Sequence, residues 1–180
     1  PIRLLLMLLM LMGLLASPYA SLMPALVRRV FQGDSDYMGY FMAASGLGGV
    51  IGTLYLAARP SVRGLLRVLT AASFSAGAAL AVLAWSHSVW LALPLLAVIG
   101  FGMLVTSVSV NMILQTIVED DKRGRIMSLY TAAFLGMSPF GSLIAGVVAD
   151  RIGIAATLTL GGVCCALAAA YTYSRRREMR

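Results

Sequence analysis

Charge is the scarcest property of this 180-residue chain. Only 12% of its residues are Asp, Glu, Lys or Arg, whereas 60% are hydrophobic. A soluble domain carries about a quarter charged residues, because its surface must be solvated. A disordered chain combines low hydrophobicity with high net charge. Both classes are therefore excluded, and the composition predicts a membrane protein.

Cysteine and histidine are also scarce. The two cysteines, Cys164 and Cys165, are adjacent in an apolar run, which excludes a disulfide framework and a Cys-based zinc site. The single histidine, His87, lies in a short turn between Trp85 and Trp90, too shallow to meet a serine inside the membrane. Hydrolase and metalloprotease chemistry is unsupported, so we expect no enzyme activity, no metal and no other cofactor.

Six stretches of the chain carry no charge, and they contain 24, 22, 19, 31, 24 and 23 residues. A helix needs roughly 20 apolar residues to cross a membrane, and a charge at its centre costs about 2.5–3.5 kcal/mol. Continuous apolar runs favour helices over barrel strands, which alternate apolar and polar residues. We predict an all-α membrane protein, one domain over residues 1–180, with six transmembrane helices near 4–26, 37–58, 67–86, 89–114, 126–148 and 153–174.

The basic residues indicate an orientation. If the spans alternate in direction, eleven of the fourteen Lys and Arg residues fall on one side of the membrane and three on the other. Basic residues accumulate in short cytoplasmic loops, so both ends of this segment should be cytoplasmic. The net charge of +7 then reflects membrane topology, and we expect the lipid bilayer as a partner and no nucleic acid.

The N-terminal residues allow two readings. Arg3, the apolar run 4–15 and the small residues 16–20 resemble a secretory signal peptide. Apolar character resumes at Leu22, however, which completes a full-length span and favours a membrane helix. The chain opens on Pro1, in what reads as the middle of a protein. We expect a piece of a longer chain, with a natural half-size protein as the alternative.

Polar side chains gather on particular spans, and such grouping marks helices that face protein or water. Ser107, Asn111 and Gln115 recur every four residues and therefore share one helical face. This face either lines a substrate cavity, which we favour, or forms hydrogen bonds between helices. With polar residues of the first and fifth spans, the candidate cavity residues are Ser17, Tyr19, Ser107, Asn111, Gln115, Tyr130, Thr131 and Ser138.

Glycines and prolines indicate where helices approach closely or bend. Small residues at four-residue spacing, as at Gly48 and Gly52, let helix backbones approach in lipid. The fifth span has a similar glycine pattern, which is weak evidence for a three-plus-three repeat. Prolines deep in a span can bend it. The residues predicted for packing and bending are Gly48, Gly52, Pro18, Gly136, Pro139, Gly141 and Gly146.

Three segments carry a resemblance to a known family: Arg123–Tyr130 (RGRIMSLY), Met42–Gly48 (MAASGLG) and Gly146–Gly153 (GVVADRIG). The whole chain resembles the C-terminal half of a major facilitator superfamily carrier, of the drug and siderophore exporter group that includes the enterobactin exporter. The resemblance implies helices seven to twelve of a twelve-helix fold, built as a 3+3 inverted repeat beside an N-terminal six-helix half. It also implies proton-coupled export of small amphipathic organic molecules across a bacterial inner membrane by alternating access. A six-span non-catalytic subunit of a multi-protein complex is the alternative.

Apart from Arg67, the first residue of the third, the predicted spans contain no Asp, Glu, Lys or Arg. A proton-coupled carrier usually keeps an ionisable group in the membrane as its relay. The coupling residue is therefore expected outside this segment.

The loop after the second span departs from the family's Gly-x-x-x-Asp-Arg-x-Gly-Arg pattern, because it keeps basic residues but has no acidic partner. Carboxylates of the next loop on the same side could pair with its arginines, or all these charges could simply be solvated. The candidate gating or loop charges are Arg59, Arg63, Glu119, Asp120, Asp121, Arg123 and Arg125.

Overall fold

The structure, a computed structural model, describes residues 2–16, 18–33, 35–59 and 64–175. These residues form α-helices joined by short loops, with two π-helical segments. The elements are α1 Ile2–Leu11, η1 Met12–Ala16, α2 Tyr19–Arg29, α3 Ser35–Ala57, α4 Leu65–Leu83, α5 Val89–Ile117, α6 Arg123–Thr131, η2 Ala132–Gly136, α7 Met137–Ile152 and α8 Ile154–Ser174.

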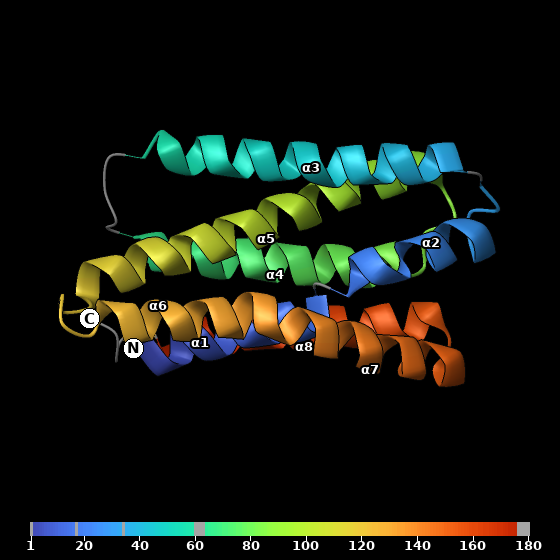
Figure 1. Cartoon of the computed structure of the whole chain (residues 1–180). Coiled ribbons are helices and arrows are strands. Elements are labelled where there is room, and N and C mark those ends of the chain that lie inside the picture. Colours follow the sequence, from blue (N-terminus) through green and yellow to red (C-terminus); the bar gives the residue numbers. More distant parts are fainter. Residues whose placement is uncertain (1, 17, 34, 60–63, 176–180) are drawn as a thin grey trace.

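Within the described part of the chain, six helical units are long and apolar enough to cross a membrane. This finding confirms the all-α prediction with six spans. α3, α4, α5 and α8 are each one span, whereas α1–η1–α2 and α6–η2–α7 each form a span interrupted by a π segment. The spans run lengthwise in one bundle, as Figure 1 shows. The longest helix, α5, has 29 residues, about 43 Å at 1.5 Å per residue, which exceeds a hydrocarbon core of about 30 Å.

Four unbroken helices pack in a row, in the order α3, α5, α4 and α8. The two interrupted spans lie against each other and against α8. Lipid gives helices no hydrophobic reason to associate, so close packing and hydrogen bonds hold them together. Between α4 and α5, the hydroxyl oxygens of Ser73 and Thr106 lie 2.7 Å apart and are buried. They form a polar link inside the bundle.

α4 and α8 meet through a reciprocal contact. A Cβ built on Gly77 would lie 2.6 Å from the carbonyl oxygen of Gly162, and one on Gly162 would lie 2.5 Å from the carbonyl oxygen of Gly77. Reciprocal contacts arise where a twofold axis relates two elements. The third and sixth spans are the pair that such an axis relates in a bundle of two three-helix repeats.

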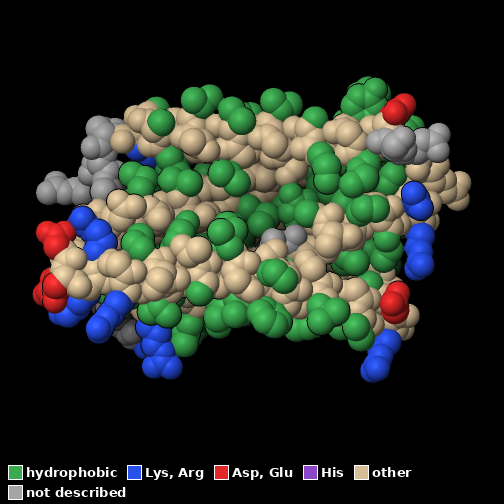
Figure 2. Space-filling view, in the orientation of Figure 1, with side chains coloured by type: hydrophobic (Ala, Val, Ile, Leu, Met, Phe, Trp, Pro, Cys, Tyr) green, Lys and Arg blue, Asp and Glu red, His purple; other side chains and the backbone are tan. Residues whose placement is uncertain are grey.

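The surface of the bundle is apolar along its length and charged at its two ends, as Figure 2 shows. Large hydrophobic side chains are strongly exposed on α3, at Leu47 and Leu54, and on the fifth span, at Leu135 and Leu143. A soluble protein exposes large continuous apolar patches only at interaction sites. The surface is that of a protein whose helices span a membrane.

Candidate functional site

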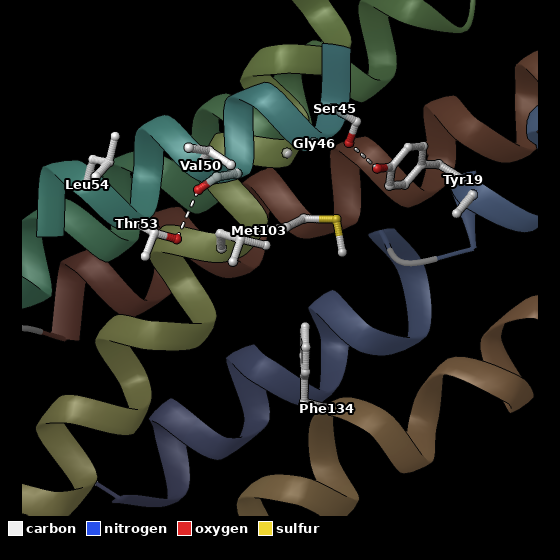
Figure 3. A pocket seen from close by; sticks show the side chains of 12 residues that line it. Tyr19, Ser45, Gly46, Val50, Thr53, Leu54, Met103 and Phe134 are labelled. Atoms are coloured by element: carbon white, nitrogen blue, oxygen red, sulfur yellow. Dashed lines mark hydrogen bonds between the residues drawn. The ribbon is translucent and has the colours of Figure 1, made fainter. Parts of the chain in front are cut away.

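A cavity of about 560 Å³ lies where four spans meet, between α2, α3, α5 and η2. In Figure 3, side chains of α3 form one wall, while Tyr19 and Phe134 approach from the opposite side and Met103 lies between them. The cavity is about midway along the spans, because Tyr19 and Phe134 both lie at the interruptions of their helices. Its wall includes Tyr19, Ser45, Gly46, Thr53, Met103 and Phe134.

The polar side chains among the described lining residues carry hydroxyls, and none of these lining residues is charged. The hydroxyl oxygens of Tyr19 and Ser45 lie 2.6 Å apart in a hydrogen bond that links α2 to α3. The Thr53 hydroxyl donates to the carbonyl of Gly49 at 3.0 Å. Both bonds are drawn in Figure 3. The cavity can therefore accept an uncharged or weakly polar surface without leaving a buried charge unpaired.

Two π-helical segments place the side chains that face α3. η1 precedes Pro18 and contains Leu14, the residue four positions before that proline; η2 precedes Pro139 and contains Leu135 in the same relation. A proline has no amide hydrogen and clashes with the carbonyl four residues earlier, and a π segment widens the helix at that point. Tyr19 therefore begins a new helix at the cavity.

The interrupted spans cross at close range. A Cβ on Gly141 would lie 2.2 Å from the carbonyl oxygen of Leu14, and one on Gly13 would lie 2.7 Å from that of Phe134. Only glycine permits this approach, which brings η1 against η2 and α7. The backbone that carries Phe134 is thereby held beside the first span.

The polar face predicted on the fourth span does not line this cavity. The Ser107 and Tyr130 hydroxyls lie 2.8 Å apart, and the Asn111 amide points to the Met127 sulfur at 3.9 Å. Gln115 donates to the Asn111 side-chain oxygen. In this structure the polar face joins α5 to α6 by hydrogen bonds, which is the alternative that the sequence left open. Contact between this face and a substrate stays a prediction.

The remaining polar candidates lie in three settings. Tyr19 lines the cavity. The Thr131 hydroxyl is exposed and donates to the Met127 carbonyl at 3.1 Å. Ser138 is half-buried near the start of α7, and Ser17 lies outside the described residues.

The charged loop residues pair within their own loop. Glu119 pairs with Lys122, and Asp120 with Arg123 at 3.0 Å. All four side chains are largely exposed, so these pairs add little stability. Cross-loop pairs with Arg59 are absent among residues 2–16, 18–33, 35–59 and 64–175.

Three further charged candidates, Arg59, Asp121 and Arg125, form no ion pair with another described residue. The Arg59 guanidinium lies 5.7 Å from the centroid of the Tyr55 ring, with one of its terminal nitrogens buried and without a hydrogen bond. Asp121 and Arg125 are exposed. Arg63 lies outside the described residues, so the gating role of this group stays a prediction.

The glycines proposed for packing divide into two groups. A Cβ on Gly48 would lie 1.9 Å from the Ala97 carbonyl oxygen, and one on Gly52 would lie 3.0 Å from a Val105 methyl. Gly141 makes the contact with Leu14 described above. At Gly136 an added Cβ would meet only the Ala132 side chain, at 4.0 Å, and at Gly146 it would meet none of the described atoms within 4 Å.

Sequence reasoning missed most of the wall. Ser45, Thr53, Met103 and Phe134 were not among the candidates, and the second span was expected to provide packing rather than lining. One signal was present, since Ser45, Gly49 and Thr53 recur every four residues and share a helical face. Met103 and Phe134 carry no such signal, because apolar residues are ordinary in a membrane helix.

The fold and the cavity define a class. Six helices that can span a membrane, with a reciprocal contact between the third and the sixth, form half of a major facilitator fold. The chain matches the transmembrane secretion effector family of that superfamily over residues 1–180. It belongs to this family and is a multi-pass membrane protein of the transporter class.

Two relatives are named for transport. The staphyloferrin A transporter of Staphylococcus aureus (strain NCTC 8325 / PS 47) is 28% identical over 164 residues, which are 90% of this chain and 41% of that protein. The multidrug efflux pump Tap of Mycolicibacterium fortuitum is 28% identical over 120 residues, which are 67% of this chain and 29% of that protein. The chain thus matches less than half the length of these relatives.

Proposed function

We propose that this chain is the C-terminal half of a secondary active transporter that exports small amphipathic organic molecules by alternating access. The observation that carries the proposal is the uncharged, largely apolar cavity formed midway along the spans by α2, α3, α5 and η2. The family match over residues 1–180 and the relative named as an efflux pump support it.

The cavity chemistry suits an amphipathic organic molecule. Its volume of about 560 Å³ falls within the roughly 300–1,000 Å³ of sites for drug-sized ligands. The ring of Phe134 and the thioether of Met103 can pack against apolar groups of different shape. The hydroxyls of Tyr19 and Ser45 can exchange their mutual hydrogen bond for bonds to a ligand.

Alternating access requires a second half and a helix that bends. A second set of six helices would cover the exposed faces of α3 and the fifth span, where Leu47 and Leu143 are 63% and 69% exposed, and transport would proceed by rocking of the halves around a midplane site. The interruptions at Pro18 and Pro139 provide bending points beside the cavity. With the basic side in the cytoplasm, both ends of the chain would be cytoplasmic.

Proton coupling, if it drives export, must use a residue of the other half. The described spans carry charged residues only in their end turns, such as Arg28, Arg67 and Asp150. Efflux should therefore stop when a protonophore collapses the gradient, while substitutions in this half should alter substrate affinity more than the proton dependence.

The experiment compares two tryptophan substitutions in the complete transporter, expressed in cells that lack their own efflux pumps. Gly46 lines the cavity, and a Cβ built on it would meet no described atom of another helix within 4 Å, so Gly46→Trp fills the cavity without a backbone clash. Val82→Trp places the same ring on an exposed position of α4 that does not line the cavity. Gly46→Trp should abolish efflux of an amphipathic fluorescent dye, with Val82→Trp near the parent. Equal efflux in both variants would refute the cavity as the substrate path.

A further inference from the structure

A second cavity, of about 490 Å³, lies between the first turns of α4 and the last turns of α8. Its wall includes Arg67 and Phe74 from α4 and Ala170 and Tyr173 from α8. It shares no lining residue with the cavity of Figure 3. α4 and α8 also lie behind α5 and α7 in the view of Figure 1, so this groove is a separate site.

The groove opens on a face of α4 that has the pattern of a lipid-facing surface. The exposed residues Arg67, Ala71, Phe74, Val82 and Trp85 lie three, four or eight residues apart and follow one helical face. The face begins with an arginine, continues through apolar side chains and ends with a tryptophan that is 66% exposed. Arginine and tryptophan are the residues that anchor a span at its two membrane surfaces.

A positive charge without a protein partner lies at the mouth of the groove. In the ranges that the structure describes, no carboxylate lies within ion-pair distance of Arg67. In the loop between α5 and α6, Glu119 and Asp120 pair with Lys122 and Arg123, and the exposed Asp121 forms no ion pair with Arg67. The Arg67 side chain is exposed, so it can bind an anion from the membrane surface.

Apart from Thr70 and the hydroxyl of Tyr173, the rest of the described lining is apolar. Thr70 is the other polar residue of α4 in its wall, and its hydroxyl donates to the Leu66 carbonyl at 2.9 Å. From Arg67 to Phe74 is seven residues, which is about 10 Å along a helix and about a third of the hydrocarbon thickness. The groove therefore combines a cationic end at the surface with an apolar length that enters the membrane.

We propose that this groove binds an anionic phospholipid of the adjoining leaflet, with its phosphate at the Arg67 guanidinium and one acyl chain between Phe74 and Ala170. Basic pockets between transmembrane helices recognise anionic head groups, and a planar guanidinium matches the geometry of a phosphate. The site is distinct from the transport cavity and does not depend on the substrate.

Native mass spectrometry of the purified complete transporter tests the site, with phosphatidylglycerol and phosphatidylcholine of identical acyl chains as probes. The parent should bind phosphatidylglycerol more tightly. Arg67→Gln should weaken phosphatidylglycerol about fivefold, the equivalent of about 1 kcal/mol for one basic residue, and leave phosphatidylcholine unchanged. Ala170→Phe should weaken both lipids, because the ring fills the groove, and Ala170 is exposed, so the core is not crowded.

The matched control is Arg151→Gln, which removes an exposed arginine at the end of α7, on the opposite membrane surface, and should change neither affinity. Equal affinity of the parent for the two lipids, or no effect of Arg67→Gln, would overturn the proposal. It would also fail if Ala170→Phe blocked dye efflux while phosphatidylglycerol bound as before, because the groove would then hold the substrate. Loss of transport activity alone leaves the lipid measurement intact, so the two proposals fail separately.

Discussion

Replacing Gly48 by Ala tests whether the close contact between α3 and α5 holds the wall of the cavity in place. A Cβ on Gly48 would lie 1.9 Å from the carbonyl oxygen of Ala97, whereas ordinary van der Waals contact begins at 3.4 Å. The two backbones must therefore move about 1.5 Å apart at this point. The same two helices meet again where a Cβ on Gly100 would lie 1.9 Å from the Ser45 carbonyl oxygen, so the separation would reach the cavity.

The magnitude follows from two opposing effects. Overpacking costs about 1–3 kcal/mol, and the upper end applies because the obstacle is backbone, which cannot rotate away. Exchange of Gly for Ala inside a helix contributes up to about 1 kcal/mol in the other direction. We expect Gly48→Ala to lower the free energy of unfolding by about 2 kcal/mol, or the apparent melting temperature by about 4–8 °C. Gly39→Ala is the matched control in α3, because its Cβ would meet no described atom of another helix within 4 Å.

Thermal unfolding in detergent, followed with a maleimide that fluoresces on reaction with a thiol, suits this protein. Cys165 is fully buried in α8, and Cys164 lies beside it at the middle of the same span, exposed only to the detergent. Because the thiolate is the reactive form, both thiols should react when the bundle opens to water. Gly39→Ala should match or exceed the parent in melting temperature. If Gly48→Ala melts together with Gly39→Ala, the two backbones are not in contact at Gly48 and the reasoning is refuted.

Three further predictions concern the cavity and its bending points. Tyr19→Phe and Ser45→Ala each remove one partner of the 2.6 Å hydrogen bond between α2 and α3. A double-mutant cycle on thermal stability should give a coupling energy of about 0.6 kcal/mol, and at most about 1.7 kcal/mol. Strictly additive losses of stability would contradict the hydrogen bond. Pro139→Ala restores an amide donor, so the α-helix of α7 should extend back through η2. The melting temperature should then rise and efflux should fall. Unchanged efflux would argue against bending of the span at this point. Phe134→Ala removes the aromatic wall and should reduce resistance to an aromatic drug about fivefold, measured as the inhibitory concentration; resistance to a small aliphatic cation should change less, and equal changes would exclude a stacking role.

The membrane spans could be predicted from the sequence because a charged residue inside the membrane costs a large free energy of insertion. A charge at the centre of a span costs a few kcal/mol, so charge-free runs mark helices directly, as between His87 and Glu119, where the structure has α5. The positions at which the helices begin and end are less constrained by the sequence. α5 continues to Ile117 and the fifth span begins at Arg123, because polar residues are tolerated at the membrane surface.

The cavity could be predicted only in part, because a hydroxyl or an amide has two ways to be satisfied. Ser107 could have lined a cavity or bonded to a neighbouring helix, and the choice depends on Tyr130, 23 residues away in the chain. Tyr19 was found because polar residues near an interrupted span are conspicuous. Met103 and Phe134 were not, since an apolar wall has no polarity to distinguish it from a lipid-facing surface.

The π segments also determine which side chains of these spans share a face, and where a single residue can be deleted. A π turn contains one residue more than the α turn that it replaces, and one residue corresponds to a rotation of about 100° in an α-helix. The side chains before η2 and those after it therefore do not share one continuous helical periodicity. Because of this offset, Tyr130 faces α5 while Gly141 faces η1. Deleting a single residue within 132–136 should turn the segment into a regular helix and keep the phase of α7. The same deletion in α3 would rotate everything beyond it, so η1 and η2 are the places where these spans tolerate a change of length.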